Sequence, residues 1–319
     1  MKHLFIINPM AGGIKGKVSE TVGMVRSVAE ELGEPFEIYV TKRMLDAHNK
    51  IKAEAELRDR LNIYACGGDG TLNECVNGAA GLSHLAVTHY PCGTGNDFIR
   101  MFGKSDVEKF RDLRALANGT VRPIDLIYCN GRYSINICSV GIDARVGADV
   151  HKYSQMPLIG GATGYVVSLF VNIAKGVSSD FGITTREERR EGKFSLICAC
   201  NGRFYGGGFN PVPEALPDDG VIEFLIVKGV SRIKAISIIK KFSAGRYREL
   251  GDYITHIRGD SMRIDSASDF VVNIDGEQMR TKSLDMRLVP KGINFIFPSD
   301  MDFFERNCAL DPQSPAVAR

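Results

Sequence analysis

The first third of the chain alternates short apolar runs with longer stretches whose apolar residues recur at helical spacing. The apolar runs have the length of buried strands and cover residues 4–7, 36–40, 62–66 and 85–89. The helix-like stretches cover residues 18–32 and 47–57 and resume at Leu72. Strands that alternate with helices predict a parallel sheet with helices on both faces. In such sheets, ligands bind at the loops that follow the carboxyl ends of the strands.

From about residue 127 the pattern changes to short strand candidates separated by turns. The candidates cover residues 133–140, 194–200, 221–227, 262–264, 270–274, 283–289 and 293–297. Glycine-containing turns are predicted at 219–220, 275–276 and 291–292, and helical stretches at 162–174 and 232–242. This pattern predicts an antiparallel sandwich or barrel.

The two patterns together predict an α/β plus mostly-β chain. An N-terminal parallel α/β domain over residues 1–126 is followed by an antiparallel β-sandwich-like domain over residues 127–298. We expect residues 299–319 to pack back on the first domain, and the proline-containing end from Asp311 onward to be frayed.

Composition and charge narrow the class of protein. The 40 Lys and Arg residues against 38 Asp and Glu residues leave a formal charge of +2, which argues against a nucleic-acid binder. The longest nearly uncharged stretch, 154–174, contains Pro157 and several glycines, so we expect no transmembrane segment. The eight cysteines form no CxxC pair, which favours reduced, buried thiols in the cytoplasm over a disulfide framework or a zinc site.

A glycine-rich loop at residues 67–70 lies between a predicted strand and a predicted helix. Backbone N–H groups in such a loop, together with the helix N-terminus, bind anionic oxygens. Asp69 would repel a phosphate unless Mg²⁺ lies between them, so the loop indicates a metal-bound nucleotide. A tight turn capped by Asp69 or Thr71 explains the same residues, and this loop alone does not separate the two interpretations.

Two further loops favour phosphate binding. Residues 8–13 close the first strand and residues 91–98 close the fourth, and both are rich in small and amide-bearing residues. Neither is a dinucleotide fingerprint, because no GxGxxG opens the first helix, and Phe98 stands where a Walker A loop needs its leading glycine.

These motifs resemble the diacylglycerol kinase catalytic domain, and most closely the soluble bacterial lipid kinases related to sphingosine and ceramide kinases. The Gly-Gly-Asp-Gly-Thr core at 67–71 is shared with NAD kinases, whereas Gly-Thr-Gly-Asn-Asp-Phe at 93–98 is more specific. The resemblance continues through motifs at 136–144, 205–208, 213–220 and 275–277, and covers nearly the whole chain. It implies ATP and Mg²⁺ as cofactors and makes residues 1–126 the nucleotide-binding domain.

The resemblance also implies roles for individual residues. The implied ATP-binding residues are Asn8, Pro9, Ala11, Gly12, Thr41, Gly67, Gly68, Asp69, Gly70, Thr71, Asn73, Gly93, Thr94 and Asn96. Asp69 would approach Mg²⁺, and Asp97 and Asp125 would lie near the lipid. Asp219, with the backbone carbonyls of Leu216 and Val221, matches a second, structural Mg²⁺ site.

Two positions depart from the family pattern. Glu214 stands where the family commonly has Asp, and Leu45 stands where a Gly precedes the Asp-Ala that opens the second helix. Both changes bear on local geometry only.

The Asp275-Gly276-Glu277 segment has two interpretations. The resemblance assigns Glu277 as the base, with Asp275 and Asp69 as further catalytic carboxylates. Residues two apart on an extended chain share a face, so Asp275 and Glu277 both suit one cleft. Asp-Gly between two strand candidates is also a hairpin signal. With the nucleotide loops present we favour catalysis, and which of the two carboxylates is the base stays open.

We therefore expect a lipid kinase, diacylglycerol being the favoured acceptor and a sphingoid base the alternative. A non-catalytic nucleotide- or lipid-binding regulatory protein of the same fold is the second hypothesis, and an NAD kinase fits the later motifs less well. The lipid substrate predicts a cytoplasmic protein that is peripheral at the inner membrane face. Basic residues at 186–190 and at 240–248 are candidate contacts with anionic lipid. The sequence leaves open whether the chain forms a homodimer.

Overall fold

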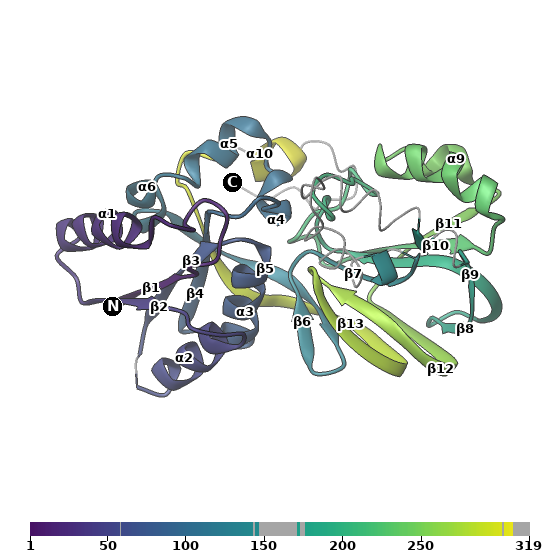
Figure 1. Ribbon diagram of the computed structural model, residues 1–319, viewed down its shortest axis with the longest axis horizontal. Helices are drawn as coiled ribbons and strands as arrows, with labels where there is room; N and C mark the ends of the chain where they lie inside the picture. The colour runs from purple at the N-terminus through teal and green to yellow at the C-terminus, as the bar shows by residue number, and fades with distance from the viewer. Residues whose placement is uncertain (58, 143, 147–170, 173–175, 302, 309–319) are drawn as a thin grey trace.

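The computed structural model describes residues 1–57, 59–142, 144–146, 171–172, 176–301 and 303–308 (Figure 1). The helix predicted over residues 162–174 lies outside these residues except for 171 and 172, and so does the tail beyond residue 308. Within the described ranges, no helix combines the length and the apolar composition that a bilayer crossing requires.

The first part of the chain is built on four strands that pair in parallel. The strands are β1 (Lys2–Ile7), β2 (Phe36–Val40), β3 (Leu61–Gly67) and β4 (Leu85–Pro91), in the spatial order β4-β3-β1-β2. Residues 4–7 are fully buried, as expected for a strand covered on both faces. The covering helices α1 (Val18–Glu31), α2 (Asp46–Ala55) and α3 (Asp69–Ala79) lie on the two sides of this sheet (Figure 1).

Short helices and a hairpin complete this part. They are α4 (Asp97–Arg100), α5 (Lys104–Lys109), α6 (Leu113–Ala117), α10 (Phe303–Cys308) and strand β6 (Arg132–Ser134), which pairs with β5 (Thr120–Cys129). The ring of Phe303 lies 4.8 Å from that of Phe102 at right angles to it. The last described helix, α10, thus packs against the apolar core of the first part of the chain.

The last strand joins the two parts of the molecule. Strand β13 (Glu277–Phe297) runs antiparallel to β12 (Ser261–Ile274) and β5, and its end pairs in parallel with β4. The turn predicted at residues 291–292 is wrong, because this is a bulge inside β13, where Lys291 has a φ of 51°. The N–H group of Lys291 donates to Oδ1 of Asp125 at 2.7 Å, which satisfies the bulged backbone and lets the strand continue.

The second part is mostly antiparallel strands. They are β7 (Ile137–Gly141), β8 (Ser179–Thr184), β9 (Arg189–Cys200), β10 (Ile222–Lys228) and β11 (Ile254–Gly259), in the order β11-β10-β9-β7-β12, with β8 pairing both β9 and β12. Apolar clusters cover both faces, one of them beneath helix α9 (Arg232–Ser243) and the short 3₁₀ helix η1 (Tyr247–Leu250). The prediction of a β-rich second half is confirmed.

Candidate functional site: a cleft between the nucleotide loops and the β12–β13 hairpin

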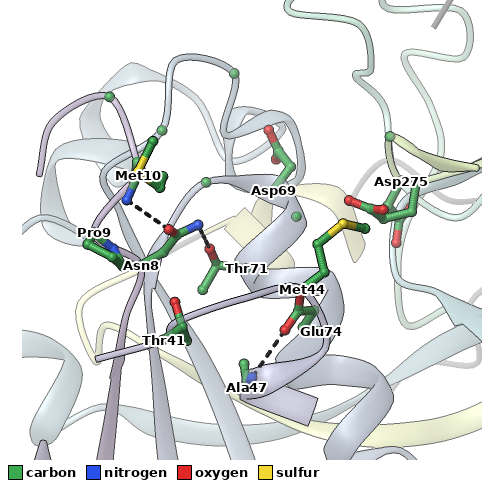
Figure 2. A pocket seen from close by; sticks show the side chains of 18 of the residues that line it. Asn8, Pro9, Met10, Thr41, Met44, Ala47, Asp69, Thr71, Glu74 and Asp275 are labelled. Atoms are coloured by element: carbon green, nitrogen blue, oxygen red, sulfur yellow. Dashed lines mark hydrogen bonds between the residues drawn. The ribbon is translucent and has the colours of Figure 1, made fainter. Parts of the chain in front are cut away.

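The loop after β1 is tied to the start of α3. The N–H group of Met10 donates to Oδ1 of Asn8 at 2.9 Å, which closes a short side-chain turn. The Nδ2 group of Asn8 donates to Oγ1 of Thr71 at 3.0 Å (Figure 2). Asn8 therefore connects the first loop with the first turn of α3.

The loops after β3 and β4 touch backbone to backbone. A Cβ atom on Gly93 would lie 2.5 Å from Cα of Gly68, so neither loop has room for a side chain at the contact. Asn96 adopts a left-handed conformation, with a φ of 51°, and its amide group exchanges two hydrogen bonds with the backbone of Gly93. The close contact leaves the N-terminus of α3 open to the cleft.

Replacement of Gly93 by Ala is expected to lower the free energy of unfolding by about 1–3 kcal/mol, because the methyl group would overlap backbone. Gly23→Ala in α1 is the matched control: nothing lies within 4 Å of its new methyl group, and helix propensity predicts a gain of about 0.5–1 kcal/mol. Urea unfolding of both variants measures the difference, and equal stability would refute the close contact.

Two acidic residues, Asp69 and Asp97, lie beside this contact and are joined by a hydrogen bond. The N–H group of Asp97 donates to Oδ1 of Asp69 at 2.6 Å, and Oδ2 of Asp97 accepts from the N–H group of Gly207 at 2.9 Å. Oδ1 of Asp97 is buried without a hydrogen bond, although the guanidinium of Arg100 lies 3.6 Å away. Burial, and then the charge of Asp69, raise the pKa of Asp97 to about 6, and burial also raises the pKa of Asp69.

The Asp275-Gly276 turn of the β12–β13 hairpin brings two further carboxylates to the cleft. Both turn residues have positive φ angles, 51° and 96°, as expected for the tight turn of a hairpin. The hairpin interpretation and the cleft interpretation of this segment therefore describe the same structure.

Asp275 is held by hydrogen bonds on every side. Its carboxylate accepts from Oγ of Ser134 at 2.5 Å and from Nδ2 of Asn73 at 3.0 Å. Three backbone N–H groups, of residues 135, 136 and 137, donate to it at 2.9, 3.1 and 3.0 Å. Burial raises the pKa of this carboxyl group against these bonds. Asp275 thus ties α3, the β6–β7 connection and the hairpin together.

Glu277 has a different environment. It is partly exposed, and within the described part of the chain no hydrogen bond or ion pair holds its side chain. A Cβ atom on Gly70 would lie 3.3 Å from Oε1 of Glu277. The free carboxylate of Glu277 therefore lies directly over the first turn of α3.

The three loops, Asp69, Asp275 and Glu277 line one cavity of about 730 Å³ (Figure 2). Of the residues expected from the sequence, it is lined by Asn8, Pro9, Ala11, Gly12, Thr41, Gly68, Asp69, Gly70, Thr71, Gly93, Thr94, Asp275 and Glu277. Gly67, Asn73, Asn96 and Asp97 lie behind this lining and support it. The sequence assigned no individual role to the other lining residues, which are Met10, Lys42, Arg43, Met44, Ala47, Glu74, Gly95 and Gly276. Met10, Gly95 and Gly276 lie in segments that the sequence indicated.

Glu74 explains the Leu45 departure. Leu45 has a φ of 61°, a conformation that favours glycine. The carboxylate of Glu74 accepts hydrogen bonds from the N–H groups of Leu45 and Ala47 at 2.9 and 3.1 Å. These bonds hold the loop after Thr41 in place without a glycine.

Four expected residues lie away from this cavity. Asp125 is buried and accepts from the N–H group of Gly220 at 2.8 Å as well as from Lys291. Leu216 and Asp219 line a second cavity of about 460 Å³. The N–H group of Val221 donates to Oδ1 of Asp219 at 3.1 Å. Burial raises the pKa of Asp219 to about 7.

Glu214, the second departure, also lines that cavity, where it accepts hydrogen bonds from Tyr247 and Arg248. Among the described residues, no three His, Cys, Asp or Glu side chains converge as a complete metal site. A cation at either place would depend on backbone or substrate oxygens as well.

Two family models match the chain. The model described as diacylglycerol kinase catalytic domain matches residues 2–129. The model described as YegS C-terminal NAD kinase beta sandwich-like domain matches residues 136–297, about half of the chain.

Similar proteins agree with these models. A Shewanella frigidimarina protein named "Probable lipid kinase YegS-like" is 29% identical over 294 residues, which cover 89% of this chain and 92% of the relative. A diacylglycerol kinase crystal structure from Bacillus anthracis has a TM-score of 0.67 at 22% identity and covers 94% of this chain and 98% of its own. The crystal structure of yeast NADH kinase, at 12% identity, has a TM-score of 0.50, and the match covers 100% of this chain and 90% of the yeast protein's chain. The two structures show a shared fold.

Proposed function

Since the chain belongs to the lipid kinase family that joins a diacylglycerol kinase catalytic domain to a YegS-type C-terminal domain, we propose that it transfers the γ-phosphoryl group of ATP to the hydroxyl group of diacylglycerol. The observation that carries this proposal is the position of Glu277, a carboxylate without partners among the described residues that lies over the N-terminal turn of a helix. In this proposal residues 1–126 bind ATP and residues 127–298 bind the lipid.

Phosphoryl transfer requires a protein to position the reactants and to balance negative charge. The loops after β1, β3 and β4 offer backbone N–H groups to phosphate oxygens, and the N-terminus of α3 adds its partial positive charge. Lys42 and Arg43 line the same cavity and bring cationic side chains. A triphosphate with its anionic end at α3 fits this distribution of charge.

The carboxylates of Asp69 and Asp97 suit Mg²⁺. Their mutual repulsion, the raised pKa of Asp97 and its buried oxygen without a hydrogen bond are what a divalent cation relieves. Magnesium bound there would supply positive charge to the phosphate oxygens. Asp219, with the carbonyl groups of Leu216 and Val221, offers the oxygen ligands of a second, structural site. Burial raises the pKa of Asp219, and a cation bound there would favour its charged form.

Glu277 acts as the general base in this scheme. It accepts the proton of the lipid hydroxyl group as the oxygen attacks the γ-phosphorus atom, while the bond from that atom to the β–γ bridging oxygen breaks and ADP leaves. Asp275 holds the hairpin that carries Glu277, since its own oxygens are taken by five donors. The lipid would reach the cleft from the inner face of the cytoplasmic membrane.

A transfer assay with γ-labelled ATP and mixed detergent micelles tests this proposal. We expect label in phosphatidic acid when diacylglycerol is the lipid, and loss of that label when Mg²⁺ is chelated. Parallel reactions contain a sphingoid base or a ceramide. Label in one of these and none in phosphatidic acid would refute the acceptor. Label in no lipid, with ATP bound, would favour the non-catalytic alternative.

A further inference from the structure

Helix α9 has one well-defined buried face. Ser231 caps its N-terminus by accepting the N–H group of Lys234 at 3.3 Å. Ala235, Ile238 and Phe242 are buried in the apolar cluster that also contains residues of β9 and β10. Their spacing at i, i+3 and i+7 places them on one stripe of the helix. These three side chains therefore pack α9 against the sheet.

The opposite face of α9 exposes apolar side chains. Ile233 is 85% exposed, the highest value among the large exposed hydrophobic residues in the described part of the chain, and Ile236 is 49% exposed. Arg232 and Lys240 are exposed as well. At 3.6 residues per turn these four side chains fall within an arc of about 100°. The solvent face of α9, defined by these four residues, thus combines isoleucines with basic groups.

The charge of α9 has a single sign. Its twelve residues include four basic and no acidic ones. The ammonium group of Lys234 lies 4.1 Å from the centre of the Tyr253 ring, and Lys241 pairs with Glu249 at 3.1 Å. In the described ranges, neither Arg232 nor Lys240 takes part in an ion pair. The two basic groups beside the isoleucines are therefore uncompensated.

The basic cluster at residues 186–190 differs from α9 in that its charges are paired. Each of its arginines has a carboxylate partner: Arg186 pairs with Asp260, Arg189 with Glu191 and Arg190 with Glu188. A cluster whose charge is cancelled locally attracts an anionic surface weakly. The candidate contact at 240–248 is mostly paired as well, because Lys241 and Arg246 pair with Glu249 and Arg248 pairs with Glu214. Of its basic residues only Lys240 has no ion pair in the described part of the chain, so the structure favours the solvent face of α9, which contains Lys240.

We propose that the solvent face of α9 docks on an anionic lipid bilayer, with Ile233 and Ile236 inserted among the acyl chains and Arg232 and Lys240 at the headgroups. Helices that lie in the membrane interface combine these two kinds of side chain, and their binding grows with apolar area and with attraction to anionic lipid. The proposal rests on the proposed function in that a lipid kinase must reach its acceptor in a membrane.

Sedimentation of the full chain with vesicles tests the docking. Wild-type protein is expected to bind vesicles that contain phosphatidylglycerol and to bind pure phosphatidylcholine vesicles less. The double variant Ile233→Ser/Ile236→Ser is expected to lose at least about tenfold in partition onto the anionic vesicles. Lys240→Glu, which keeps the isoleucines, is expected to lose about fivefold or more.

Matched controls separate α9 from general surface effects. Leu57→Ser removes an exposed aliphatic side chain outside α9, and Arg189→Glu/Arg190→Glu reverses the charges of the paired cluster. Both are expected to bind vesicles as wild type does. Equal loss in the controls, or no loss in either α9 variant, would overturn the proposal. A change in oligomeric state on Ile233→Ser/Ile236→Ser with vesicle binding intact would also overturn it, since a second copy would then cover this face.

A kinase assay without a bilayer keeps this test apart from the proposed function. With a short-chain diacylglycerol dissolved as monomers, the α9 variants are expected to retain wild-type turnover, because none of their residues lines the cleft. Vesicle binding is measured without ATP, so loss of binding by the α9 variants supports docking whatever the acceptor proves to be. Loss of turnover on the soluble lipid would show that α9 acts on the cleft instead, and would contradict the proposal.

Discussion

Glu277→Gln is expected to lower kcat for lipid phosphorylation by about 10²–10⁴-fold, the range that a general base contributes, with ATP binding and stability unchanged. The reason is geometric. Oε1 of Glu277 lies above Gly70 at the start of α3, and no hydrogen bond or ion pair in the described residues holds the side chain. The amide group keeps the shape of the side chain but cannot accept the hydroxyl proton.

Asp285→Asn is the matched control, because Asp285 is a carboxylate of the same strand outside the cleft, paired with Arg287. It is expected to leave kcat near the wild-type value. Turnover measured on diacylglycerol micelles, together with calorimetric ATP binding, gives both quantities. A folded Glu277→Gln protein with wild-type kcat would remove Glu277 from the chemistry.

Asp275→Ala is expected to lower the free energy of unfolding by about 3 kcal/mol or more, since each buried donor left without an acceptor costs about 1–3 kcal/mol. Five donors converge on this carboxylate, and they come from Asn73, Ser134 and the backbone of residues 135–137. Denaturant unfolding measures the loss. The hairpin that carries Glu277 is then released, so turnover falls together with stability.

The comparison of Glu277→Gln with Asp275→Ala distinguishes a carboxylate that takes part in the reaction from one that holds the structure of the site. Glu277→Gln changes turnover alone, whereas Asp275→Ala changes turnover and stability together. Asp275→Asn is expected to be intermediate, because the amide oxygen still accepts while its NH₂ group faces donors. An Asp275→Ala protein as stable as wild type and without turnover would instead make Asp275 the base.

Local sequence patterns predicted most of the strands and helices in the N-terminal half of the fold. The runs at β1, β3 and β4 are mostly apolar because those strands are buried on both faces, and a glycine-containing loop follows each of them. Strands β5, β8 and β11 were missed because they mix polar and apolar residues, and β5 contains Pro123. Their pairing with neighbours far along the chain supplies the stability that their own composition does not.

The loops of the candidate site were predictable from the sequence. The hydrogen bonds that join residues far apart in the chain were not. Glycine loops at strand ends are visible in the sequence, but the hydrogen bonds of Asp275 come from residues about 140 and 202 positions away, which no local pattern reveals. Lys42 and Arg43, which follow Thr41 directly, were a signal that sequence reasoning left unused. The bulge at Lys291 depends on Asp125, and a turn pattern cannot show such a partner.

The most direct measurement is a crystal structure with Mg²⁺ and a non-hydrolysable ATP analogue. We expect the triphosphate against the loops after β1, β3 and β4, with its γ-phosphoryl group on the side of the cleft that carries Glu277. A nucleotide bound elsewhere on the molecule, or bound in the cleft with its phosphates directed away from the β12–β13 hairpin, would contradict the account.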